Sequence, residues 1–310
     1  MALAIAQMVL PVLLVIALGY LCKQKSWLDE AGLAGLKTVV SRITLPVVLF
    51  NAFFTADYSA VTLLTFAVVF ASLGVALAVS FWARRLNPRY AKFMPFLMTG
   101  FEGGMLGYAL FGLLYGADQT HVFAMVDIGQ TVFAYTVFLS ALKVADGKKP
   151  SAKAVAVNVL TTPASAGMLL GIVLGATGVG KWALHSSAGE LLGKLIGFLT
   201  APTSVLILLI VGYELSVSRS LMKPVLITAL LRLAVMGALC GVCALIVFSL
   251  TPFDKKLLVA LLLGFSLPAP FIIPLFADTA GHGEYISTTL SFSTLFSILA
   301  FIGVAVYTLA

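Results

Sequence analysis

The sequence predicts an all-α polytopic membrane protein of ten transmembrane helices, built as two inverted five-helix repeats with broken, crossing helices 4 and 9. Three observations lead to this fold class: the composition, the spacing of long apolar segments, and helix-breaking residues at matching places in the two halves. Hydrophobic residues make up 61% of the 310 residues, and charged residues only 10%. A soluble domain carries roughly 25% charged residues, so the composition excludes an ordinary soluble protein.

The apolar segments are long enough to cross a bilayer. The hydrocarbon core is about 30 Å thick, so a spanning helix needs about 20 mostly apolar residues. Ten segments meet this length: residues 3–22, 33–54, 61–83, 93–115, 121–142, 154–177, 190–213, 224–249, 257–278 and 286–309.

Basic residues indicate how these segments are oriented. The odd-numbered connections contain Lys23, Lys25, Arg84, Arg85, Arg89, Lys92, Lys143, Lys148, Lys149, Lys153, Arg219 and Lys223. The even-numbered connections contain Lys181, Lys194, Lys255 and Lys256. Because basic loops stay cytoplasmic, we expect a multi-pass protein of the inner (plasma) membrane with both termini extracytoplasmic. No basic residue precedes the first segment, so we interpret it as a mature helix and not as a signal peptide.

The most polar connection, "KVADGKKPSAK" at residues 143–153, divides the chain into halves. We therefore predict a first five-helix repeat at 1–142, a cytoplasmic linker at 143–153 and a second repeat at 154–310. A unit with an odd number of spans must be inverted when it is repeated. Two short similarities agree with this: "TLP" at 44–46 with "TAP" at 200–202, and "GFE" at 100–102 with "GFS" at 264–266.

Helix-breaking residues cluster in the fourth and ninth segments. Glu102 lies among Gly100, Gly103, Gly104 and Gly107, and the stretch "SLPAPFIIP" contains Pro268, Pro270 and Pro274. Backbone groups freed at bilayer depth must be satisfied by protein or by a water-filled cavity. Matched broken helices are typical of secondary transporters, whose half-helix ends point at the substrate and coupling ions.

Three stretches together resemble the auxin efflux carrier family, which includes the plant PIN carriers and bacterial relatives. They are "RITLPVVLFNAF" (42–53), the glycine-rich fourth segment, and "LPAPFIIPLFA" through "YISTTLSFSTLFSIL" (267–299). The resemblance implies a scaffold of helices 1, 2, 6 and 7 and a moving transport domain of helices 3–5 and 8–10. It also implies a substrate site beside the crossing helices, elevator-type alternating access, and a homodimer formed through the scaffold helices.

The sequence departs from the pattern of the family that it resembles at two positions. Many members have asparagine about where Glu102 lies and proline about where Ala109 lies. An ionisable residue inside a span costs about 2.5–3.5 kcal/mol on insertion scales and usually serves a pathway or a partner. We interpret Glu102 as a proton-carrying site, because the neutral acid is cheaper to bury than the anion. Two alternatives stay open: a carboxylate that caps broken backbone amides, and a cation ligand.

A polar stripe follows one face of the fifth segment, with Asp127, Gln130, Thr131 and Tyr135 at helical spacing. Such a face lines either a cavity or a neighbouring helix, and we favour the cavity. The tenth segment has a comparable row of serines and threonines, for which bonding to neighbouring helix carbonyls is the favoured interpretation.

Two arginines lie within the predicted spans. The planar guanidinium of Arg42 matches the geometry of a carboxylate, and it either faces the site or reaches the cytoplasmic surface. Arg232 is expected to pair with Asp127, Glu102 or Glu214.

The complete set of predicted substrate-binding residues is Arg42, Asn51, Glu102, Gly103, Gly104, Asp127, Gln130, Thr131, Pro268, Ala269 and Pro270. Glu102 and Asp127 are also the predicted coupling residues. No catalytic residue, cofactor or metal site is expected. Cys22, Cys240 and Cys243 suggest no disulfide framework, and Cys240 and Cys243 are interpreted as small packing residues. His121, His185 and His282 lack metal-ligand spacing.

The expected function is therefore secondary active transport of a small organic anion, a mono- or dicarboxylate, by an elevator mechanism coupled to protons through Glu102. The partners would be that anion, a proton or sodium ion, the lipid bilayer and a second copy of the chain, with no nucleic acid. The alternatives are a sodium-coupled organic-anion symporter of the bile-acid-symporter type and a non-translocating membrane sensor or channel. An enzyme is not expected, because the chain has no hydrolase, phosphate-binding or zinc motif.

Overall fold

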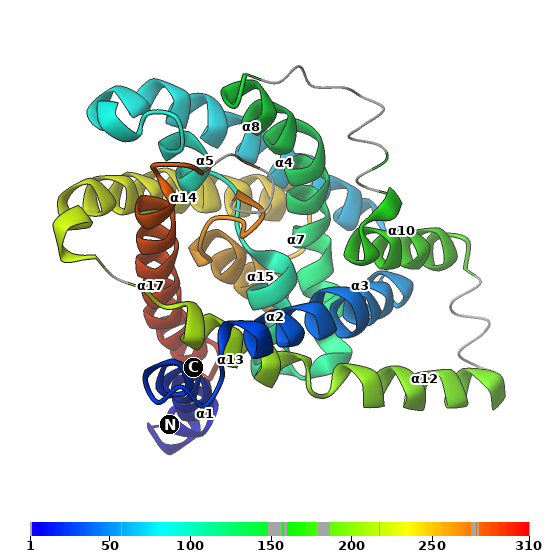
Figure 1. The fold of residues 1–310 in the computed structure, drawn as a ribbon. Coiled ribbons are helices and arrows are strands. Elements are labelled where there is room, and N and C mark those ends of the chain that lie inside the picture. Colours follow the sequence, from blue (N-terminus) through cyan, green and yellow to red (C-terminus); the bar gives the residue numbers. More distant parts are fainter. Residues whose placement is uncertain are drawn as a thin grey trace.

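The computed structural model describes residues 2–56, 58–147, 157, 160–178, 187–216, 218–273, 277 and 279–309. All regular elements in these ranges are helical (Figure 1). The α-helices are α1 (Ala2–Gln24), α2 (Glu30–Val39), α3 (Leu45–Phe54), α4 (Ala60–Ala83), α5 (Met94–Met98), α6 (Tyr108–Tyr115), α7 (Thr120–Phe133), α8 (Leu139–Ala145), α10 (Pro163–Ala176), α12 (Ser187–Thr200), α13 (Thr203–Glu214), α14 (Met222–Leu250), α15 (Lys255–Ser266) and α17 (Gly283–Leu309). Three π-helical turns, η1 (Val40–Thr44), η4 (Gly103–Gly107) and η6 (Ala134–Phe138), interrupt or begin longer helices. Four short 3₁₀ turns are η2 (Arg84–Leu86), η3 (Pro88–Tyr90), η5 (Ala117–Gln119) and η7 (Arg219–Leu221).

Seven helical stretches in the described part of the chain are long and apolar enough to cross a membrane. They are Glu30–Phe54, Ala60–Leu86, Met94–Tyr115, Ala117–Ala145, Gly189–Glu214, Arg219–Leu250 and Gly283–Leu309. Val9–Gln24 and Pro163–Ala176 are shorter apolar helices, and α15, in the ninth predicted segment, has 12 residues. The protein is thus all-helical and polytopic by length and composition, while the number of ten spans stays a prediction.

The most extensive helix contacts join α3 to α10 and α1 to α13. Glycine makes both contacts close. Gly171 of α10 lies against the carbonyl of Phe50, and Gly212 of α13 lies against the carbonyl of Ile16. Small residues allow such backbone contact between membrane helices, where van der Waals packing drives association.

The two TxP motifs mark matching interruptions. At Thr44 the π-turn η1 gives way to α3, with Pro46 in the first turn of the new helix. At Thr200 helix α12 ends, and α13 begins directly after Pro202. Proline lacks an amide donor, so it interrupts a preceding helix and is tolerated at the start of the next one, which explains why both helices restart there.

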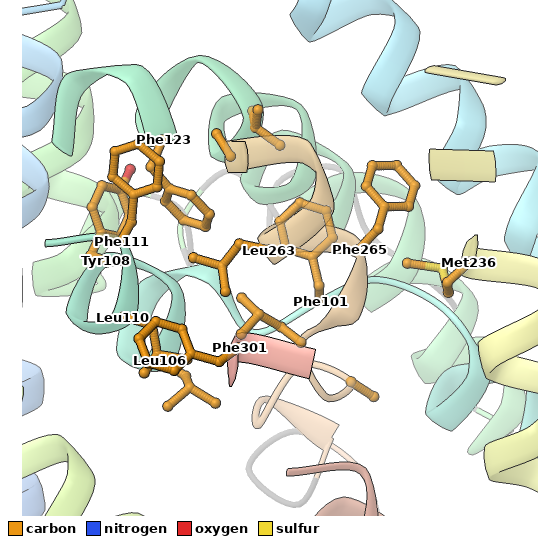
Figure 2. Packing of buried hydrophobic residues seen from close by; sticks show 14 of the residues in the cluster. Phe101, Leu106, Tyr108, Leu110, Phe111, Phe123, Met236, Leu263, Phe265 and Phe301 are labelled. Carbon is orange, nitrogen blue, oxygen red and sulfur yellow. The ribbon is translucent and has the colours of Figure 1, made fainter. Parts of the chain in front are cut away.

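Beside the α3–α10 and α1–α13 pairs, a group of helices surrounds α15, which lies in the middle of the molecule (Figure 1). Helices α7, α14 and α17 all pack against α15, and α4 packs against both α7 and α14. Aromatic side chains fill this core: the rings of Phe101 and Phe265 lie 5.7 Å apart, and those of Tyr108 and Phe123 lie 5.0 Å apart (Figure 2). The core therefore forms around the fourth and ninth predicted segments.

Some sequence predictions fall outside the described residues. The predicted linker 143–153 is described only to residue 147, and residues 148–153 lie outside, as do parts of the sixth predicted segment. Pro274, Lys181 and His185 also lie outside the described residues.

We predict that Gly212→Ala lowers the melting temperature of the purified protein. A methyl group at this position would overlap the backbone carbonyl of Ile16, which cannot move aside as a flexible side chain can. Gly197→Ala on α12 is the matched control, because among the described residues no atom lies within 4 Å of the place that its new methyl group would take. Equal melting temperatures of the two variants would contradict the close α1–α13 contact.

Candidate functional site

The fourth and ninth segments are both interrupted, and they meet at the interruption. Helix α5 ends at Met98, and α15 ends at Ser266. We call residues 99–102 and 267–272 the crossover. Within it, the amide of Glu102 donates to the carbonyl oxygen of Pro268 over 2.9 Å. Gly100 has a φ of 75°, a backbone conformation that residues with a Cβ rarely adopt.

Arg232 of α14 satisfies the carbonyl groups at this interruption. Its Nη2 donates to the carbonyl oxygens of Gly100 and Leu267, each over 2.6 Å. Its Nη1 donates to the carbonyl oxygen of Leu97 over 3.3 Å. The side chain is buried. The arginine therefore caps the C-terminal ends of both α5 and α15, where helix dipoles are negative.

The prediction that Arg232 pairs with Asp127, Glu102 or Glu214 was wrong. Arg232 donates to the three carbonyls, and Glu214 forms an ion pair with Lys37 instead. The physical reason is that a broken helix leaves carbonyls without amide partners, and these compete with carboxylates for a buried guanidinium.

Glu102 binds backbone amides at the crossover, whereas Arg232 binds carbonyls. Its Oε2 accepts from the amide of Phe271 over 2.6 Å, and its Oε1 accepts from the amide of Met105 over 3.1 Å. Met105 lies in the first turn of the helical segment η4–α6, and Phe271 follows the interruption of the ninth segment. This geometry fits the capping alternative for Glu102, because both oxygens bind backbone amides and the side chain is buried.

A cavity of about 270 Å³ borders the crossover. Its wall is formed by η1 and α3, by the start of α10, by η4, by one face of α7 and η6, and by residues 270–272. Arg42 lies on this wall with an exposed side chain. Within the described part of the chain, it forms no hydrogen bond or ion pair. Arg42 therefore borders the cavity, and its role toward a ligand stays a prediction.

Most of the predicted site residues meet in this cavity. They are Arg42, Glu102, Gly103, Gly104, Asp127, Gln130, Thr131 and Pro270, and Tyr135 joins them. Asn51 on α3 and the crossover residues Pro268 and Ala269 do not line it. The polar stripe on the fifth segment therefore faces a cavity, as favoured from its spacing. On α17, Thr289, Thr294 and Ser297 donate to carbonyls of their own helix, also as favoured.

Sequence reasoning missed one wall of the cavity. Thr162, Pro163 and Ser165 at the start of α10 line it, together with Met168. The signal was present as "TTPAS" at 161–165, a polar and proline-containing interruption at the start of an apolar segment. Ser41, Met105 and Phe271 were also missed; they border both this cavity and a second one of about 350 Å³ between α2, α13 and α17.

Adjacent glycines in the wall have different surroundings. A methyl group on Gly103 would overlap Oδ1 of Asp127. On Gly104 it would meet only Oε1 of Glu102 at 3.7 Å and a methyl carbon of Leu45 at 3.9 Å, which are ordinary contacts. The Asp127 carboxyl thus lies directly against the backbone of Gly103, while Gly104, which also lines the cavity, has no neighbour that close.

The helical architecture with its long apolar helices is that of a polytopic membrane protein, and its interrupted segments border a cavity that several polar side chains line. The family model described as "Membrane transport protein", the auxin efflux carrier family domain, matches residues 4–305, and the chain belongs to this family. No significant match to a curated protein was found.

We predict that Gly103→Ala disrupts the site whereas Gly104→Ala is tolerated. The first methyl group must displace Asp127 or the crossover backbone; the second adds only van der Waals contacts. The melting temperature and ligand-induced stabilisation of the two variants provide the measurement. If Gly104→Ala were the more damaging change, the described contact between Gly103 and Asp127 would be wrong.

We also predict that Arg232→Met destabilises the protein by about 3 kcal/mol or more, since each hydrogen bond to a charged group contributes about 1.5–3 kcal/mol and the carbonyls are left unpaired. Arg42→Met, which removes an exposed and unpaired guanidinium, should leave the unfolding free energy nearly unchanged. Denaturant unfolding in detergent would measure both. Equal stability of the two variants would show that Arg232 does not hold the crossover.

Proposed function

We propose that this protein is a secondary active transporter of a small organic anion, a mono- or dicarboxylate, that binds beside the crossover. The observation that carries the proposal is the unpaired Arg42 on the wall of the cavity. Arg232 is occupied by carbonyls, so among the described residues that line the cavity, Arg42 is the cation that can meet a ligand carboxylate. A guanidinium binds a carboxylate with two parallel hydrogen bonds.

The position of the cavity supports elevator-type alternating access. One wall belongs to η1, α3 and α10, which fall among the scaffold helices implied by the family resemblance. The other wall belongs to the crossover, α7 and η6, which fall in the transport domain. A substrate held between two such groups can be carried when one group slides along the other.

Two inverted repeats, residues 1–142 and 154–310 joined by the linker 143–153, are part of the same proposal. The α3–α10 and α1–α13 pairs support it, because each joins the second helix of one half to the first helix of the other. The proposal also places both termini outside the inner membrane, which the distribution of basic residues supports. It includes a homodimer formed through the scaffold helices, which the family resemblance supports.

Proton coupling through the acids of the cavity, Glu102 and Asp127, is the proposed energy source. Two buried carboxyls close to each other and to an anion site favour proton uptake, because like charges oppose a second ionisation. Sodium coupling predicts sodium-dependent exchange at constant pH, and a channel predicts no stimulation by substrate on the opposite side.

A binding and exchange assay would test the function. We predict that at least one of acetate, benzoate, malonate and succinate raises the melting temperature of the wild-type protein by mass action. Arg42→Ala should weaken that response about 10- to 100-fold in concentration, since a charge-assisted hydrogen bond contributes about 1.5–3 kcal/mol, and Arg42→Lys should restore part of it. Counterflow of the same acid in liposomes should follow the binding order.

If Arg42→Ala bound the acid as tightly as the wild type does, Arg42 would not be part of the anion-binding site. A wild-type protein that binds an acid but shows no counterflow would instead indicate a sensor or channel.

A further inference from the structure

We propose that Asp127 carries the coupling proton, while Glu102 stays ionised as a structural cap of the crossover. This inference rests on the proposed function, and it reverses the assignment that the sequence favours. It depends on how differently the two buried carboxyl groups are surrounded.

Glu102 is surrounded as a carboxylate should be. Each of its oxygens accepts a hydrogen bond from a backbone amide, those of Met105 and Phe271. These amides belong to helical or turn starts after the two interruptions, where the backbone is electropositive. Protonation of Glu102 would weaken both bonds and with them the connection between the fourth and ninth segments.

Asp127 has much weaker support for a negative charge. Only 1% of the residue is exposed. Its Oδ2 accepts from the hydroxyl of Thr131 over 3.2 Å, and no described protein group donates to its Oδ1 with ordinary geometry. An ionised carboxylate can accept about four hydrogen bonds, and burying it without partners is costly. A neutral acid fits this environment better.

The charged and titratable neighbours of Asp127 do not change this conclusion. From the crossover Glu102 faces it, and from α6 Tyr108, whose buried hydroxyl is beside Asp127 and also lacks a bond of ordinary geometry. Tyr135 follows on the same helix, and Arg42 lies across the cavity. Helices α3 and α4 and the turn η4 contribute no titratable side chain. Helix α15 contributes Lys255 and Lys256, which donate to the carbonyl oxygen of Thr308 and to Oε1 of Gln119, and η5 contributes the exposed Asp118.

A proton suits this position better than a metal ion. Oδ1 lies directly against the backbone of Gly103, and a metal ion would need a shell of several oxygen ligands there. A proton adds to the oxygen without such a shell. It can reach the carboxyl from the cavity, because Asp127, Gln130 and Thr131 form part of the cavity wall.

The coupling follows from charge. With Asp127 protonated, Arg42 and Glu102 balance each other, and an anion meets no net negative charge. With Asp127 ionised, the three groups together carry one net negative charge, which repels the anion. Binding of a monoanion is therefore linked to uptake of one proton. A low pH favours the bound state.

Infrared spectroscopy tests the assignment without any ligand. Wild-type protein in detergent, titrated from acid to alkaline pH, should show the carbonyl band of a buried carboxylic acid. Carbon-13 labelling of aspartate carboxyls should shift this band, and labelling of glutamate carboxyls should leave it in place. Asp127→Asn should remove it, and Asp118→Asn, at an exposed position of η5, should not. A band that responds to the glutamate label, or no such band, would overturn the proposal.

The isotope result needs no variant, so it stands even if Asp127→Asn fails to fold. A transport measurement then checks the coupling. In counterflow with an acid that the wild type exchanges, the rate should change by up to about tenfold per pH unit, as expected for one linked proton. This pH dependence should flatten in Asp127→Asn and persist in Glu102→Gln, whatever their absolute rates.

A pH dependence that flattens only in Glu102→Gln would return the proton to Glu102. If the wild type exchanges none of the four acids, the proposed function fails, and the infrared result still decides which acid holds the proton.

Discussion

Free main-chain groups at the crossover are the constraint on which the rest of this structure depends. Breaking two helices in the apolar interior leaves carbonyls at one set of ends and amides at the other, and each must find a partner. The protein supplies both partners itself. Arg232 binds the carbonyls of Leu97, Gly100 and Leu267, and Glu102 binds the amides of Met105 and Phe271. Each charge lies at the helix end of opposite polarity.

This arrangement assigns Arg232 and Glu102 to the structure of the crossover and leaves the other charged groups of the cavity for the proposed function. Broken helices in transporters can present their ends to the ligand, but here the protein's own side chains occupy them. In the proposed function, a ligand is recognised by the remaining polar groups of the cavity, Arg42 on one wall and Asp127 with its neighbours on the other. Because the two walls belong to different helix groups, a bound anion would touch both.

Glycine allows close contacts at several places where a side chain would not fit. Gly171 and Gly212 allow backbones to touch in the α3–α10 and α1–α13 pairs, and Gly103 allows the Asp127 carboxyl to approach the crossover. Gly104, the next residue, has no comparable neighbour. The close contacts hold the helix pairs together by van der Waals packing, since lipid offers little hydrophobic driving force between helices.

The sequence by itself determined the membrane setting, the positions of seven long apolar segments, the interruption in the fourth segment, and the cavity-facing stripe on the fifth. These features depend on local properties: apolar length, helical periodicity, and the backbone preferences of glycine and proline. The tertiary structure decided the partners of Arg232, the capping position of Glu102, the contribution of α10 to the cavity and the difference between Gly103 and Gly104. Those depend on distances between segments far apart in the chain. Charge alone predicted an acid as the partner of Arg232, but the carbonyls freed by two broken helices lie closer.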